Sequence, residues 1–502
     1  MDLGEGHKAG VAAGHRETAK AALEVLKAGG NAFDAVIAGF LAACVAEPVL
    51  SSLGGGGFLV AKPADGDVSV FDFFTETPLN RPSRDDVDFH PVTADFGVAQ
   101  QEFHIGMGAV ATPGAIAGIF EIHNALGRVP MTELVSPARG LARDGIRLNR
   151  FQAYLLGVVG PIYQTSAGSR ALFCRNGSNE LLSADDYYRP AAFSDFLDAM
   201  VREGPELFYL GDIAARITSM DGCVLGMDDL ANYRVARRHP LHTQLGSHEI
   251  FLNPPPAIGG ALIDYALKCL RLSQLRPGDF GSERHAAALI HAMDAANHAR
   301  IECGIDRDAN AGAQVLAGLI PHPPSYRGTT HISVADADGN LAALTVSNGE
   351  GCGHVVPDTG IMLNNMLGED DLNGAGFFEW PEGVRLSSMM TPGLMVDPDG
   401  MWTAFGSGGS NRIRSALTQV ILNICVYGTD LAEALCRPRL HLEGNKLSVE
   451  PGFAHTPSWP DEVHVWPEAN MFFGGVHVVQ RDTAGSVQGA GDPRRDGISL
   501  GF

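Results

Sequence analysis

The residues best suited to covalent chemistry are Gly328, Thr329, Thr330 and His331. A threonine hydroxyl inside a chain is a weak nucleophile, but at a chain terminus its own α-amine, with a pKa of about 8, can accept the proton. Cleavage of the peptide bond before Thr329 would therefore create a nucleophile and its base together. Gly328 has no side chain, so the preceding peptide could bend for attack by this hydroxyl. By itself, a Thr-Thr pair at the start of a strand is most often simply part of a strand.

Motifs for other kinds of hydrolysis and for nucleotide binding are missing from the sequence. It contains neither the H-E-x-x-H pattern of zinc peptidases nor the G-x-S-x-G pattern of serine esterases. The glycine cluster at 54–57 lacks a third spaced glycine, and the one at 406–410 lacks a lysine, so neither predicts a nucleotide loop. His285, His291 and His298 share one predicted helix without a suitably spaced acid. We interpret them as surface residues and expect no metal and no cofactor.

The candidate nucleophile lies at the start of a predicted β-hairpin. Residues 330–335 and 341–347 alternate with period two around a turn at 336–340, which is typical of two antiparallel strands. The stretch 303–328 is polar and aperiodic and is predicted to be a loop. Strand pairing would hold the backbone of Thr329, and its branched Cβ would restrict the side chain.

Helical spacing of apolar residues predicts most of the other elements. The predicted helices cover residues 17–28, 32–46, 114–126, 131–144, 286–300 and 410–426, and further strands are expected at 58–61 and 68–73. Four consecutive glycines precede the first of these strands, which indicates closely packed backbone or dihedral angles that other residues avoid. This order of elements predicts an α/β fold of the α+β type, with sheets sandwiched between helical layers.

Composition indicates a large globular core and excludes several partner classes. Of 502 residues, 45% are hydrophobic and 19% are charged, and the net charge of −22 repels nucleic acids and anionic membranes. The most apolar run, residues 35–46, is too short for a membrane-spanning helix, which needs about 20 residues. Because no leader-like segment precedes the first patterned element, we expect a cytoplasmic protein. The eight cysteines form no C-x-x-C pair and are interpreted as small hydrophobic residues.

One segment and several glycine-rich motifs resemble the γ-glutamyltranspeptidase family. Residues 329–340 look like the start of the small subunit of these self-cleaving N-terminal-nucleophile hydrolases. Further motifs follow in the family order at 53–58, 254–260, 360–365, 386–389, 406–410 and 492–494. The resemblance implies a four-layer αββα sandwich, cleaved between Gly328 and Thr329 into associated subunits of residues 1–328 and 329–502. It also implies that Thr329 is the nucleophile, that Ser347 hydrogen-bonds it, and that Gly408 and Gly409 form the oxyanion hole.

The acyl pocket departs from the family pattern where a donor carboxylate would bind. The family holds the α-carboxylate of a γ-glutamyl donor with an arginine and two serines, and Ser387 and Ser388 match the serines. Phe74 stands at the position that aligns with the arginine. The resemblance therefore implies that the bidentate carboxylate clamp is missing.

The side of the pocket that would bind the donor's ammonium group differs as well. Gly349 stands at the family's Asn position, with Asn348 one residue away, Met366 stands at the Gln or Glu position, and Glu369 matches the Asp. The linker 369–387 is short compared with the loop that covers the glutamyl pocket in many members of the family, which suggests a more open site. Losing one partner of a buried charged pair costs about 3–5 kcal/mol, or two to three decades of affinity. Phe74 and Met366 would instead favour an acyl group with less charge and more apolar surface.

These residues predict a self-processed amidohydrolase of the γ-glutamyltranspeptidase type that hydrolyses a small acyl amide through a threonine acyl-enzyme. Members with altered pockets include acylases of glutaryl cephalosporins and amidases of oxamate. One alternative is a genuine γ-glutamyltransferase or glutathione hydrolase in which Arg81 or Arg84 reaches the carboxylate. Another is an uncut binding protein with the same fold. The expected partners are a small-molecule substrate and the two subunits of one precursor, which could assemble further into an oligomer of heterodimers.

Overall fold

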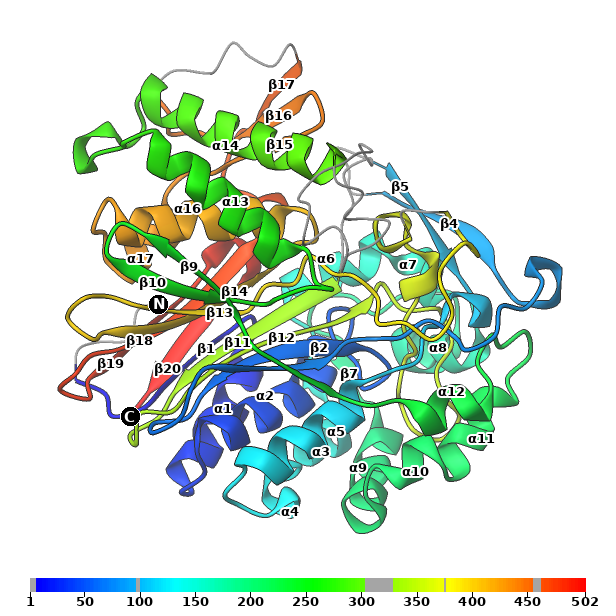
Figure 1. Ribbon diagram of the computed structural model, residues 1–502. Helices are drawn as coiled ribbons and strands as arrows, with labels where there is room; N and C mark the ends of the chain where they lie inside the picture. Colours follow the sequence, from blue (N-terminus) through cyan, green and yellow to red (C-terminus); the bar gives the residue numbers. More distant parts are fainter. Residues whose placement is uncertain (1–5, 96–99, 303–327, 374–375, 455–461) are drawn as a thin grey trace.

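A computed structural model describes residues 6–95, 100–302, 328–373, 376–454 and 462–502. In these residues two main antiparallel sheets pack face to face, and helices cover their outer faces (Figure 1). Helices α1 (Arg16–Lys27) and α2 (Ala32–Ala46) lie on one outer face, while α13 (Gly259–Leu272) and α16 (Arg412–Cys425) lie on the other. The αββα sandwich expected from the resemblance is confirmed.

The first sheet carries the candidate nucleophile near its centre. Its described strands, in spatial order, are β20 (Ile498–Gly501), β1 (Gly10–Ala13), β11 (Gly328–Ala335), β12 (Leu341–Gly349), β2 (Gly56–Lys62), β3 (Ser69–Phe73) and β8 (Ala236–Arg238). The predicted hairpin is β11 and β12. Strand β1 pairs with β11 and β20, and β2 pairs with β12. The two predicted subunits therefore interleave in one sheet, and cleavage before Thr329 would leave these ladders intact.

The second sheet packs β14 against β11 and β12 of the first. Its described strands, in spatial order, are β19 (Val487–Gly491), β18 (Gly475–Arg481), β14 (Trp402–Gly408), β13 (Gly393–Val396), β10 (His248–Leu252) and β9 (Leu241–Leu245). Smaller ladders join β4 (His90–Asp95) to β5 (Gln100–Ile105), β6 (Ile146–Arg147) to β7 (Tyr187–Tyr188), and β16 (Lys446–Val449) to both β15 (Leu440–Glu443) and β17 (Glu462–Val465). Helices and loops were expected from 110 to 298, so β8, β9 and β10 correct that prediction.

The remaining described helices extend these layers and cover one end of the sandwich (Figure 1). They are α3 (Ala115–Leu126), α4 (Met131–Leu134), α5 (Ser136–Asp144), α6 (Arg150–Val158), α7 (Gly160–Tyr163), α8 (Ala167–Phe173), α9 (Ala191–Glu203), α10 (Glu206–Tyr209), α11 (Asp212–Thr218), α12 (Met227–Asn232), α14 (Glu283–Glu302) and α17 (Leu431–Cys436). The helix predicted at 131–144 is divided between α4 and α5, because Pro137 lies in the first turn of α5 and favours a new helix start there. The loop predicted at 303–328 lies almost entirely outside the described residues.

One histidine was placed on the wrong side of its helix. His291 and His298 of α14 are exposed as predicted, but His285 is only 2% exposed. Its Nδ1 accepts the Gly281 N–H at 3.1 Å, and its ring packs against Tyr427. In the described part of the chain, no group of three or more His, Cys, Asp or Glu side chains is placed to hold a metal ion. No described helix is long and apolar enough to cross a membrane.

The cysteines are more varied than predicted. Cys44, Cys174 and Cys352 are buried as expected of small hydrophobic residues, whereas Cys436 is exposed. The described cysteines are all free thiols. The interpretation of the cysteines as small buried hydrophobic residues is therefore confirmed for Cys44, Cys174 and Cys352 and is wrong for Cys436.

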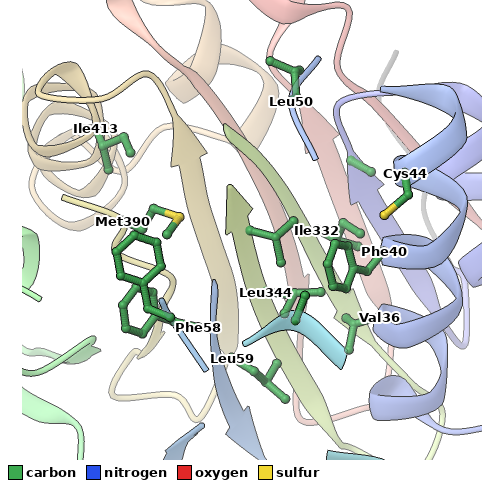
Figure 2. Packing of buried hydrophobic residues seen from close by; sticks show 14 of the residues in the cluster. Val36, Phe40, Cys44, Leu50, Phe58, Leu59, Ile332, Leu344, Met390 and Ile413 are labelled. Atoms are coloured by element: carbon green, nitrogen blue, oxygen red, sulfur yellow. The ribbon is translucent and has the colours of Figure 1, made fainter. Parts of the chain in front are cut away.

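The core on the helical side of β11 explains why α2 is apolar all round. Val36 and Phe40 of α2 point toward Ile332 and Leu344 on the two hairpin strands (Figure 2). Asn31 begins α2 with a capping box, since its side chain accepts the Asp34 N–H and its backbone N–H donates to the Asp34 carboxylate. This packing holds the hairpin against a rigid helix.

The four glycines at 54–57 allow close backbone approach. A Cβ on Gly55 would lie 2.2 Å from the carbonyl oxygen of Ser347, and one on Gly57 would lie 2.4 Å from that of Thr345. Neither glycine has a positive φ, so close packing and not unusual dihedral angles is the reason for glycine here. The glycines bring β2 tightly against β12, next to the predicted cleavage point.

Candidate active site

The junction between Gly328 and Thr329 lies at an irregularity in the pairing of β11 with β12. Thr329 is opposite Ser347, but Gly328 is opposite Gly349, so one residue of β12 is skipped. The Ser347 hydroxyl donates a hydrogen bond to the Gly328 carbonyl oxygen at 2.6 Å and accepts the Gly349 N–H at 3.1 Å. The predicted scissile carbonyl is thus polarised by a buried hydroxyl group.

The other side of the junction is held by an acid that the sequence analysis did not identify. The Gly328 N–H donates to Glu350 Oε1 at 2.8 Å, and Glu350 is 3% exposed. Thr329 is also 3% exposed, and its hydroxyl makes no hydrogen bond to any described residue. Ser347 therefore contacts the carbonyl of the predicted cleavage site and not the hydroxyl of Thr329.

Thr330 points to the helical side of β11 and binds a buried carboxyl group. Glu47, directly after α2, accepts hydrogen bonds from the hydroxyls of Thr330 at 2.7 Å and Thr18 at 2.6 Å. Burial raises the pKa of the Glu47 carboxyl, and the two hydroxyl donors offset part of this rise. This network ties the start of β11 to α1 and α2.

His331 lies two residues from the nucleophile but is occupied elsewhere. Its Nδ1 is 2.7 Å from the Thr345 hydroxyl and its Nε2 is 2.8 Å from the Ser333 hydroxyl. Burial, with a smaller contribution from His477, lowers the pKa of His331 well below its usual range. The imidazole of His331 is therefore neutral and hydrogen-bonded at both ring nitrogens. It stabilises the interface between the sheets and does not serve Thr329 as a base.

Of the two glycines predicted to form the oxyanion hole, Gly408 lies beside Thr329 and Gly409 follows it. Gly408 ends β14, and a Cβ on it would be 2.3 Å from the Thr329 carbonyl oxygen. Gly409 has φ of +134° and Ser410 has φ of +52°, so the chain turns sharply before α16 begins at Arg412. A glycine turn ahead of a helix can present consecutive N–H groups to an anion.

Glu369 lies against Gly349, at the end of β12. Gly349 has φ of +61°, and a Cβ on it would lie 2.3 Å from Glu369 Oε1 and 2.2 Å from Asn365 Oδ1. Asn348, the alternative ligand, is 1% exposed, and its side-chain amide has no hydrogen-bond partner among the described residues. One acid and one buried amide therefore lie near the pocket predicted for the acyl group.

The two predicted serines differ in their availability. The Ser388 hydroxyl accepts the Met390 N–H at 3.1 Å, and the Ser388 carbonyl accepts the Ile258 N–H at 2.9 Å. The hydroxyl of Ser387 has no partner in the described part of the chain. Ser387 is therefore the serine whose hydroxyl makes no hydrogen bond at all among the described residues, whereas that of Ser388 already accepts one.

Phe74 and Met366, predicted to lie in the acyl pocket, are buried in the apolar core. Each is 1% exposed, and the Phe74 ring stacks on Phe58 with a centroid distance of 5.4 Å. Figure 2 shows Phe58 beside Met390, on the side of the first sheet away from α2. The replacement of the family's arginine by a phenylalanine is thus accommodated as packing between the sheets.

None of the arginines near Phe74 replaces the missing clamp. Arg81 and Arg84, suggested by the sequence, are exposed: Arg81 binds the Trp380 carbonyl, and Arg84 lies over the ring of Phe89. Arg385, which the sequence analysis missed, binds the Phe74 carbonyl directly.

Arg385 is nevertheless committed to the protein's own acids. Its guanidinium pairs with Glu76 at 2.9 Å and with Asp72 at 3.6 Å, and it also binds the Tyr233 hydroxyl. Asp72 is fully buried and also pairs with Arg238 Nε at 2.7 Å, so Arg385 is one of two cations that compensate this buried carboxylate. Arg385 therefore stabilises the backbone next to Phe74.

Comparison with known proteins shows the family to which this chain belongs. A sequence model of the family described as gamma-glutamyltranspeptidase matches residues 18–502. The chain belongs to the gamma-glutamyltranspeptidase family. It is 28% identical to the glutathione hydrolase proenzyme of Escherichia coli strain K12, over 96% of this chain and 89% of that one. It is 26% identical to the acylase ACY 1 proenzyme of Pseudomonas sp. strain V22, over 99% of this chain and 94% of that one.

A solved structure confirms the architecture of this family member. The crystal structure of cephalosporin acylase from Bacillus halodurans matches with a TM-score of 0.83, covering 100% of this chain and 97% of that chain at 23% identity. At this identity the likeness shows the fold alone. Among its sequence relatives, the chain therefore has both hydrolases named for glutathione and enzymes named acylases.

Proposed function

We propose that this γ-glutamyltranspeptidase family member is a self-cleaving threonine amidohydrolase whose acyl pocket no longer suits γ-glutamyl donors. The observation that carries the proposal is the junction itself. The Gly328 carbonyl is polarised by Ser347 at 2.6 Å, while the adjacent Thr329 hydroxyl is unbonded among the described residues. Proenzyme names among the relatives support cleavage into residues 1–328 and 329–502.

In self-cleavage, the Thr329 oxygen attacks the Gly328 carbonyl carbon and the bond to the Thr329 nitrogen breaks. The nitrogen takes the hydroxyl proton, and water then hydrolyses the resulting ester. In turnover, the freed α-amine accepts the proton as the Thr329 oxygen attacks a substrate amide, and Gly408 and Gly409 stabilise the oxyanion. The proton leaves with the amine product, and water releases the acyl group.

Self-cleavage and N-terminal chemistry are tested on a denaturing gel together with N-terminal sequencing. Two bands with a new terminus at Thr329 support the proposal. A single full-length band that persists after long incubation supports the alternative of an uncut binding protein. This test does not depend on knowing the substrate.

The pocket favours an acyl group without the zwitterionic head of a γ-glutamyl donor. Phe74 and Met366 are apolar where the family pattern has charged or polar side chains, and the hydroxyl of Ser387 has no partner among the described residues. The acylase relatives support this choice, whereas the retained Glu369 beside Gly349 favours a true γ-glutamyltransferase. We expect kcat/KM for glutaryl p-nitroanilide to exceed that for γ-glutamyl p-nitroanilide at least tenfold. The reverse order would establish the transferase alternative.

Replacing Ser347 by alanine should slow self-cleavage more than turnover. The variant loses the hydroxyl that contacts the Gly328 carbonyl, and removal of one oxyanion donor typically costs 10²- to 10³-fold in rate. We expect cleavage, followed by intact mass over time, to slow about 100-fold. Ser347→Thr keeps the hydroxyl and serves as the matched control. Equal cleavage rates in Ser347→Ala and the wild type would remove this role from Ser347.

Replacing Phe74 by arginine tests the lost carboxylate clamp. A bidentate partner should lower KM for γ-glutamyl p-nitroanilide about tenfold, equivalent to about 1.4 kcal/mol. Because Phe74 is buried against Phe58, the charge should also lower the melting temperature by several degrees. Phe74→Lys carries the same charge without the planar fork and should lower KM less. An unchanged KM in both variants would show that residue 74 does not face the donor.

A further inference from the structure

A buried arginine that the proposed mechanism does not use lies beside the oxyanion turn. Arg495 follows β19 and is 5% exposed. Its Nη1 is 3.0 Å from the place a Cβ would occupy on Gly408, and its Nη2 is 3.5 Å from the corresponding place on Gly409. Its aliphatic stem fills the space where Gly475 lacks a side chain, since a Cβ there would be 2.5 Å from Arg495 Cδ. Three glycines thus make room for one guanidinium group.

Arg495 also lies close to Thr329, the proposed nucleophile, because both residues border the position that a Cβ on Gly408 would occupy. The position of a Cβ on Gly408 is 2.3 Å from the Thr329 carbonyl oxygen and 3.0 Å from Arg495 Nη1. The distance between the Thr329 carbonyl oxygen and Arg495 Nη1 is therefore no greater than the sum of these two distances. A charge this close to residue 329, in a site that excludes water, interacts strongly with any anion formed there.

In the described part of the chain, no hydrogen bond or ion pair of the Arg495 side chain explains its burial. Its Nε and Nη1 make no hydrogen bond, and it forms no ion pair, within the described residues. The preceding Arg494 is the opposite case, because it pairs with Glu450 at 2.5 Å and with Asp492 at 3.3 Å. Leaving a cation buried and unpaired costs several kcal/mol. The ion pairs of Arg494 explain why it is buried, whereas the burial of Arg495 needs a different explanation.

The charges that face Arg495 leave it cationic. The acids that act on it are Asp492, Glu350 and Glu47, and Arg412 is the facing cation. Asp492 is already paired with Arg439 at 2.6 Å, and burial raises the pKa of Glu47. Burial, followed by repulsion from Arg412, lowers the pKa of Arg495 to about 10, so it stays protonated at neutral pH.

We propose that Arg495 is an electrostatic positioning residue, whose charge stabilises the anionic tetrahedral intermediates formed at Thr329 in both self-cleavage and turnover. In each step the attacked carbonyl oxygen takes the electron pair of its π bond and becomes negative. It returns that pair when the C–N bond breaks, so the anion exists only during the reaction. The unpaired guanidinium in the resting protein is then a partner prepared for this anion. This inference rests on the proposed function.

The test compares Arg495→Gln and Arg495→Lys, with Arg494→Gln as the control for a purely structural arginine. The measurements are the cleavage rate by intact mass, kcat and KM on glutaryl p-nitroanilide per cleaved chain, and the melting temperature. The dissociation constant of n-butylboronic acid is added, because boron becomes a tetrahedral anion when the Thr329 oxygen binds it. We expect Arg495→Gln to slow cleavage and kcat about 100-fold. KM should change less than threefold, boronate affinity should fall in parallel with kcat, and the Lys variant should recover at least tenfold.

Two results would overturn the inference. One is an Arg495→Gln variant with the wild-type cleavage rate, kcat and boronate affinity. The other is equal impairment of the Gln and Lys variants at a matched loss of melting temperature, as expected of Arg494→Gln. If Arg495→Gln stays uncut, cleavage that is restored in Arg495→Lys supports the inference, and a Lys variant that also stays uncut contradicts it. A wild-type chain that never cleaves refutes the proposed function instead, so the two failures are distinct.

Discussion

The Thr329→Ala variant is expected to remain a single, inactive chain of full length. It keeps the polarised Gly328 carbonyl, with Ser347 at 2.6 Å, but lacks the only hydroxyl that self-cleavage is proposed to use. Loss of a covalent nucleophile removes the whole pathway, so cleavage and amide hydrolysis should both fall by at least 10⁴-fold. Intact mass after prolonged incubation and hydrolysis of glutaryl p-nitroanilide measure the two effects.

Two neighbouring substitutions provide matched controls for this variant. Thr329→Ser keeps a hydroxyl at the same position and should still cleave. Thr330→Ala removes the hydroxyl that binds Glu47 at 2.7 Å on the opposite side of β11, and it should also cleave. Cleavage that persists in Thr329→Ala would end the assignment of Thr329 as the nucleophile.

Replacing Gly408 by alanine should damage both stability and turnover. The added methyl would lie 2.3 Å from the Thr329 carbonyl oxygen and 3.0 Å from Arg495, and both neighbours are buried. Overpacking of this kind should lower the free energy of unfolding by about 3 kcal/mol. Displacing the oxyanion turn should lower kcat at least 100-fold. Thermal unfolding and kcat per cleaved chain measure the two effects.

The matched control for Gly408→Ala is Gly157→Ala in α6. Nothing lies within 4 Å of a Cβ on Gly157, and its φ is not positive, so this variant should gain up to about 1 kcal/mol or stay unchanged. If Gly408→Ala behaves like Gly157→Ala, the turn is more adaptable than its contacts indicate, and Gly408 would not hold an oxyanion.

Local patterns were sufficient for the elements around the nucleophile. Period-two alternation predicted the hairpin of β11 and β12, and helical spacing predicted α2 to the residue, because both signals come from neighbours in the chain. The glycine run at 54–57 correctly indicated close packing of backbone. The strands β9 and β10 were missed because each has only five residues and the pair lies among strongly helical segments.

Contacts between distant segments could not be read in the same way. Glu47 binds Thr330, Glu350 binds Gly328, and Arg495 lies beside Gly408, because α2 and β14 pack on β11 and β12 pairs with it. His285 was placed at the surface because periodicity does not show that a second helix and Tyr427 cover it. Arg385 comes just before the Ser387 motif in the sequence, yet its pairing with Asp72 and Glu76 depends on the position of β3 and of the loop that follows it.

By itself, the sequence predicted the family, the layers of the fold, and Thr329 as the residue that would begin the small subunit in β11, the third strand of the first sheet in spatial order. Side-chain types and short-range spacing carry that information. Only the tertiary structure decided that Ser347 binds the carbonyl before Thr329, that Phe74 is packed on Phe58, and that an unpaired guanidinium lies behind the glycine turn. These depend on strand register and on the burial of charge, which arise when segments hundreds of residues apart come into contact.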